Sequence, residues 1–202
     1  MTVTRTINGA TAKYIEVMEP PFDFEDDVAD AWFVDSGLQY DGVAATEISG
    51  LDHLEGEQVQ ILADGAVRGV QSVAGGKVTL KTSAEKVQVG FACPAKITTL
   101  PLVPTPPGVD PRGKHRRVYK AMVQLHRSVG GFIGVDDGTM DQIIFRRAGD
   151  PMDTAVPLFT GLKEMGSMPT SYERLPQITF RQDDPLPSTI LNLILEMDVG
   201  GV

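Results

Sequence analysis

Apolar and polar residues alternate along most of this chain in short runs, and Gly- or Pro-containing turns separate the runs. Such alternation is typical of β-strands with one buried face, and no stretch shows a long, clean helical period. The pattern predicts strands at residues 12–17, 58–62, 77–80, 86–90, 95–100, 142–145, 177–180 and 188–197. The turns in 63–67 and 74–78 favour hairpins, because Asp-Gly and Gly-Gly tolerate positive φ.

Two segments are less clear from the pattern alone. Residues 116–128, "RRVYKAMVQLHRS", alternate as a strand but also place Val118, Met122 and Leu125 at helical spacing. We prefer a strand there, since the neighbouring segments are strands. Residues 24–33, "FEDDVADAWF", predict a short helix, because acidic residues lead it where the helix dipole favours them.

The N-terminal residues 3–17 predict two short strands around Asn8-Gly9, a favoured type I′ turn. Tyr14 and Ile15 are apolar enough to require cover. A strand edge without partners pairs with another chain or frays. We therefore expect residues 1–17 to be poorly ordered or packed against a neighbouring chain.

Five prolines in residues 100–114, "LPLVPTPPGVDPRGK", mark a boundary, since proline cannot donate a ladder hydrogen bond. We predict a mainly β protein of two small barrel- or sandwich-like modules joined by this linker. Its predicted parts are an N-terminal stem with a short helix (1–34), a small β-barrel-like module (35–100), the Pro-rich linker (101–112) and a second β-sandwich-like module (113–202).

Charge is distributed unevenly along the 202 residues, whose net charge is −9. Residues 1–57 hold thirteen acids against Arg5 and Lys13, and such a surface repels nucleic acid. The basic run 112–120, "RGKHRRVYK", is expected to be solvated surface or a partner contact. No signal-peptide pattern opens the chain, and the apolar run 189–197 is too short to span a bilayer, so we expect a soluble protein made in a reducing cytosol.

The single cysteine, Cys93, excludes an intrachain disulfide and a cysteine-based zinc cage. Its apolar neighbours predict a buried, inert thiol. His53 lies among Asp52, Glu55 and Glu57, and this cluster is interpreted as an acidic turn rather than a metal site. His115 and His126 do not have the spacing of zinc ligands.

Three pairs of adjacent carboxylates are candidates for acid–base chemistry: Asp26–Asp27, Asp136–Asp137 and Asp183–Asp184. Glycoside hydrolysis needs two carboxylates facing each other about 5–10 Å apart, which adjacent strand residues cannot supply. Gly or Pro follows two of the pairs, so all three are expected at turns or on the surface. The Gly-rich stretch 128–138 lacks the Lys-Ser/Thr of a phosphate-binding loop. We predict no catalytic, cofactor-binding or metal-binding residues.

Two stretches, residues 32–102 ("WFVDSGLQYDGVAATEIS…") and 156–201 ("VPLFTGLKEMGSMPTSYERLPQITF…"), together resemble the C-terminal part of the nozzle, or stump, proteins in tails of short-tailed phages and related prophages. Residues 4–20, "TRTINGATAKYIEVMEP", are similar to the junction that leads those proteins out of an upstream propeller-like domain. Family members are much longer, so we expect this chain to be a fragment or the product of a truncated prophage gene.

The resemblance implies a structural component of the virion tail, made in the host cytoplasm. Such proteins assemble with copies of themselves, commonly as a hexameric ring, and with other tail proteins, and the ring lets DNA pass without binding it. A negative wall is consistent with that passage, because like charges prevent sticking. Two alternatives remain: a tail-associated glycan hydrolase using carboxylates such as Asp136 and Asp183, and a non-catalytic binding or adhesion module.

Overall fold

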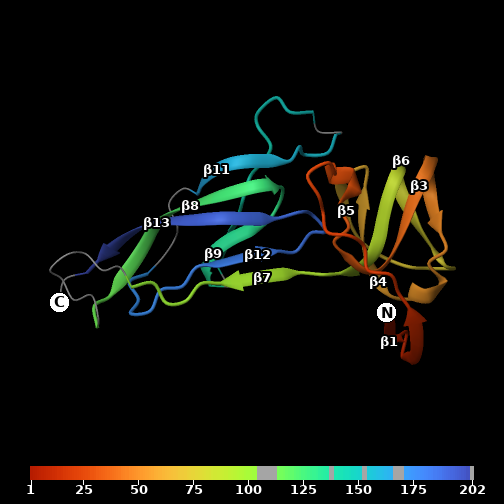
Figure 1. The fold of residues 1–202 in the computed structure, drawn as a ribbon, viewed down its shortest axis with the longest axis horizontal. Helices are drawn as coiled ribbons and strands as arrows, with labels where there is room; N and C mark the ends of the chain where they lie inside the picture. The colour runs from red at the N-terminus through yellow and green to blue at the C-terminus, as the bar shows by residue number, and fades with distance from the viewer. Residues whose placement is uncertain (104–112, 137–138, 152–153, 166–170, 201–202) are drawn as a thin grey trace. The chain divides into compact units, whose positions relative to one another are not determined.

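The computed structural model describes residues 1–103, 113–136, 139–151, 154–165 and 171–200. The chain divides into two compact units (Figure 1). Unit 1 contains Met1–Pro94, Arg146–Leu158 and Asp183–Pro187, and unit 2 contains Ala95–Phe145, Phe159–Gln182 and Ser188–Val202. Strands dominate both units, and every strand pairing among the described residues is antiparallel, so the predicted mainly β class is confirmed.

Unit 1 contains a four-stranded antiparallel sheet in the order β3-β6-β4-β5 and the separate hairpin β1-β2. Its strands are β1 (Thr2–Ile7), β2 (Ala10–Ile15), β3 (Val34–Ser49), β4 (Gln58–Ala63), β5 (Ala66–Ser72) and β6 (Lys77–Ala92). Register shifts interrupt the long pairing of β3 with β6. Thirteen buried apolar residues of this unit form one cluster, to which the sheet contributes Ile48, Val59, Ile61, Val87 and Val89.

Unit 2 is a two-sheet sandwich, with sheet orders β10-β9-β12-β7 and β11-β8-β13. Its strands are β7 (Ala95–Thr98), β8 (Arg116–Ser128), β9 (Phe132–Asp136), β10 (Thr139–Gln142), β11 (Phe159–Met165), β12 (Thr179–Gln182) and β13 (Thr189–Val199). Val123 and Leu125 of one sheet share a buried cluster with Ile133 and Phe180 of the other. Strand β7 pairs with β12 and therefore belongs to this unit.

Most predicted strands are present, and segment 116–128 is a strand as preferred. Residues 77–80 and 86–90 are parts of one long strand, β6. The prediction for 142–145 is wrong, because β10 ends at Gln142. The N–H of Ile143 still donates to the Gly131 carbonyl oxygen, and its side chain lies in the core, 2% exposed. The strand predicted from residue 177 starts at Thr179.

The helix predicted over 24–33 is wrong, since only the 3₁₀ turn η1 (Val28–Asp30) forms. Asp27 and Asp30 accept hydrogen bonds from the main-chain N–H groups of Val28 and Asp27, which makes a capping box around a single turn. Asp26 likewise accepts from the N–H of Asp23. Short acidic side chains that bind nearby main-chain groups favour turns over helix interiors.

The N-terminal hairpin forms as predicted, with Asn8 and Gly9 at φ 46° and 77°, as a type I′ turn requires. It does not lack cover altogether, because Ile7 is buried in the core of unit 1 and Tyr14 packs against that core. Ile15 remains 89% exposed. One side of the hairpin thus belongs to the local fold, and only its other side is open to a neighbour.

Gly90 of β6 lies where two strands approach closely, so we expect Gly90→Ala to destabilise unit 1. A Cβ there would lie 2.8 Å from both the Asp35 oxygen and the Gly37 Cα, which are backbone atoms that cannot rotate away. Overpacking of this kind costs about 1–3 kcal/mol in the free energy of unfolding. Urea unfolding of both proteins measures the difference.

The matched control is Gly42→Ala in β3, whose new Cβ would have its nearest contacts, at 3.2 Å and beyond, with the Tyr40 side chain. It should change stability by less than about 1 kcal/mol. Equal losses in the two variants would contradict the assigned strand approach at Gly90.

The predicted linker is residues 101–112, of which 104–112 lie outside the described part of the chain. Limited digestion with trypsin tests the boundary next to it. Lys114 is half-buried and precedes β8, whereas Arg116 is 2% exposed and lies within that strand. We expect cleavage after Lys114 but not after Arg116, and the two fragments should stay together on gel filtration, because β7 of the first fragment pairs with β12 of the second. Rapid cleavage after Arg116, or fragments that separate without denaturant, would contradict the strand pairing described for unit 2.

Candidate functional site

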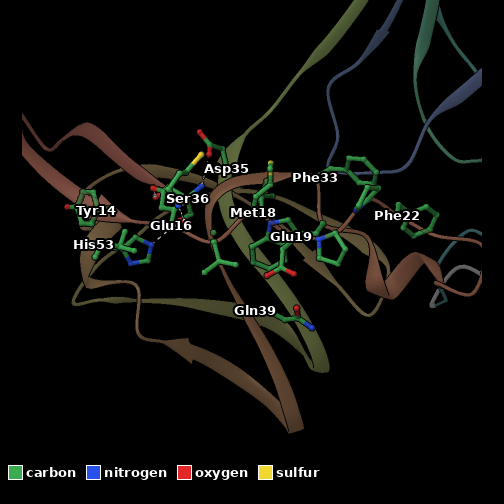
Figure 2. A pocket seen from close by; sticks show the side chains of 18 residues that line it. Tyr14, Glu16, Met18, Glu19, Phe22, Phe33, Asp35, Ser36, Gln39 and His53 are labelled. Atoms are coloured by element: carbon green, nitrogen blue, oxygen red, sulfur yellow. Dashed lines mark hydrogen bonds between the residues drawn. The ribbon is translucent and has the colours of Figure 1, made fainter.

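Unit 1 has an open groove of about 730 Å³ beside the N-terminal hairpin. One wall consists of residues 14–22, which begin with the last two residues of β2. Another consists of residues 32–37, around the start of β3. Figure 2 shows the side chains of the groove, with the Tyr14 and His53 rings near one end and Phe22 and Phe33 near the other. Aromatic, aliphatic and acidic side chains therefore line a single concave surface.

Arg5 holds the two walls together through two carboxylates. Its guanidinium donates to both oxygens of Glu16, at 2.6 and 2.7 Å, and to both oxygens of Asp35, at 2.7 and 2.8 Å. Bidentate bonds of this type are strong and fix the geometry of both partners. They lower the pKa of Glu16 and of Asp35 below their ordinary values and raise the pKa of Arg5.

Ser36 extends this network toward His53. The Ser36 backbone has φ 50°, which is unusual for a residue other than glycine. Its hydroxyl donates to Glu16 Oε1 at 3.2 Å, and its carbonyl oxygen lies 2.9 Å from His53 Nε2. Because a carbonyl only accepts hydrogen bonds, Nε2 must carry the ring proton. His53 therefore positions the start of β3.

The acidic turn around His53 is confirmed: residues Asp52–Leu54 form the 3₁₀ turn η2. Glu55 accepts from the N–H groups of Gly75 and Gly76 at 3.0 and 2.7 Å, and these bonds lower its pKa. Glu57 accepts from the N–H of Asn8 at 2.6 Å. These carboxylates hold loops in place, and the described residues include no cluster of three or more potential metal ligands.

The paired carboxylates have different environments. Asp26 and Asp27 belong to the capped turn already described, and the pKa of Asp184 is raised, first by burial and then by the neighbouring charge of Asp183. Asp137 lies outside the described residues, and Asp136 belongs to a different unit from Asp183. The hydrolase pair of Asp136 with Asp183 thus stays a prediction.

The predicted burial of Cys93 and the predicted exposure of Arg116 are both wrong. Cys93 is exposed rather than buried, because it follows the last residue of β6 in the connection to β7. Arg116 of the basic run is buried, and its Nη1 donates to the carbonyl oxygens of Leu102 and Arg174, both at 3.0 Å. Lys120 of the same run lies 2.6 Å from a Glu164 oxygen. Arg116 therefore stabilises unit 2 from within, whereas the other described basic residues of the run are not buried.

Unit 2 has a smaller hollow of about 240 Å³ between its sheets. Seven of its lining side chains are apolar and the eighth is Thr99, whose hydroxyl oxygen accepts from the N–H of Ile178 at 3.0 Å. This hollow is part of the sandwich interior and offers no charged group.

Sequence reasoning missed the Arg5 cluster that shapes the groove. A signal was present, since Arg5 is one of only two basic residues among thirteen acids in the first 57 residues. A lone arginine in an acidic segment commonly has carboxylate partners. Which of the thirteen it contacts depends on tertiary packing, and sequence cannot show that.

No protein-family model and no characterised protein matches the chain. Within the described residues, no helix has the length and apolar character needed to cross a membrane.

Arg5→Met should flatten the dependence of stability on pH. The folded-state pKa values of Glu16 and Asp35 lie below the ordinary 4.5 and 3.8, so their contribution is fully present above about pH 5 and is lost as pH falls through the folded values. We expect the variant to lose about 1–3 kcal/mol near neutral pH and less near pH 2. Thermal unfolding at a series of pH values measures this.

Lys77→Met is the matched control, because its ion pair with Glu47 is solvent-exposed and such pairs contribute little. Hydrogen exchange should become faster at residues 2–16 in Arg5→Met alone. If stability changes with pH by the same amount in wild type and Arg5→Met, the cluster does not anchor the hairpin.

Proposed function

We propose that this chain is a structural component of a phage tail, acting in an oligomeric ring at the nozzle end of the tail tube. The observation that carries the proposal is the exposed apolar surface along the groove of unit 1. Ile15, Val17 and Met18 are 89%, 85% and 80% exposed and follow one another closely along one segment. Contiguous apolar surface of this kind marks a site of protein–protein contact.

The charge distribution supports the same role. The chain carries a net charge of −9, and its acids are concentrated in unit 1. A negative channel wall lets DNA pass without retention, because phosphate binding requires a cationic surface. The resemblance of residues 32–102 and 156–201 to the nozzle proteins supplies the proposed location in the virion tail, with other tail proteins as partners.

Mass measurement in solution followed by electron-microscopic imaging tests the proposal. We expect closed rings at micromolar concentration and no retention of double-stranded DNA even at about 50 mM salt, where electrostatic binding is strong. A chain that stays monomeric, or one that binds DNA with a steep salt dependence, would contradict this role. Turnover of a bacterial surface glycan that is lost on Asp136→Asn would favour the hydrolase instead.

A further inference from the structure

The groove of unit 1 combines apolar surface with negative charge. Glu16, Glu19 and Asp35 line it, and no lysine or arginine side chain does. Arg5 balances only part of the charge of Glu16 and Asp35, and the Met1 amino group donates to the Glu16 carbonyl oxygen. Glu19 is exposed and forms no ion pair with any described residue. The groove therefore suits an occupant that carries both apolar and basic side chains.

Strand β5 of the same unit carries both a basic and an apolar exposed side chain. It is an end strand of the sheet order β3-β6-β4-β5, so one side of its backbone faces no other strand of this sheet. Arg68 on this strand is exposed and has no ion-pair partner within the described parts of the chain, and Val70 is 57% exposed. An unpaired edge with exposed side chains is a template for pairing with another chain.

Strand β5 is held in the sheet by its pairing with β4. One copy therefore cannot move its own β5 into its own groove without breaking that pairing. Strand β2, at the groove, has β1 as its only neighbour in the described sheets and so also offers a free edge. Addition of a strand to such an edge supplies main-chain hydrogen bonds, and the side chains then add specificity.

We propose that the groove binds strand β5 of a second copy, with Arg68 of that copy near Glu19 and Val70 against the apolar wall. Two different surfaces joined in this way make a head-to-tail contact, which closes into a ring when the rotation per copy allows it. This inference rests on the proposed ring function and names the surfaces that would build it.

Charge reversal tests the contact directly. Sedimentation velocity of the full chain at about 150 mM salt would compare wild type with Arg68→Glu, Glu19→Lys and the double variant. Each single reversal places like charges together and should raise the dissociation constant about tenfold or more. The double variant recreates an opposite-charge pair and should restore association to within about threefold of wild type.

Two exposed residues of β6 supply matched controls. Lys81→Glu makes the same change in net charge as Arg68→Glu, and Glu85→Lys the same as Glu19→Lys. Neither should alter association. Circular dichroism checks that all variants keep their fold, as expected for exposed positions.

The outcomes separate this contact from the ring function. Rings that form normally in both single variants, or single-variant defects that the double variant does not repair, would overturn the contact and leave the proposed function standing. A wild-type chain that stays monomeric overturns both, and would leave the groove to a basic segment of a different protein.

Discussion

The bidentate clamp of Arg5 on Glu16 and Asp35 is the interaction on which the shape of unit 1 depends. Asp35 belongs to the start of β3, and Glu16 directly follows β2, so one guanidinium joins the hairpin to the main sheet. Together with buried Ile7, it fixes where the segment after β2 must run. That segment is one wall of the groove, so the candidate site exists because of this clamp.

The clamp also explains why so acidic a segment folds. Carboxylates that repel one another destabilise a compact state unless they find donors. In unit 1 many of them do: Glu55 and Glu57 accept from main-chain N–H groups, and Asp27 and Asp30 cap a turn. Glu19 is different, because it faces the groove without a cation from the described chain. The remaining negative charge is therefore concentrated where a partner can use it.

Sequence patterns predicted the strands whose alternation is clean and failed where one residue breaks the pattern. β11 was missed because Gly161 interrupts it and because Lys163 takes the position opposite buried Val123. Lys163 is accommodated there by the Phe159 ring, 4.5 Å from its Nζ, and by the Ile144 carbonyl oxygen. The Asn8-Gly9 turn was predictable because its conformation is a local property of two residues. The exposure of Cys93 and the burial of Arg116 were not predictable, since burial depends on contacts with residues distant in the sequence.

The hairpin shows how local and tertiary information combine at the candidate site. Its strands follow from alternation and turn chemistry, yet the sequence alone makes its apolar residues look as though they lack any cover. In the structure the two sides of the hairpin differ. Ile7 is buried in the core of unit 1, whereas Ile15 is exposed on the side that the fold leaves open. The exposed side is thus the one for which association with another chain gains most, because burying apolar surface there costs none of the existing packing.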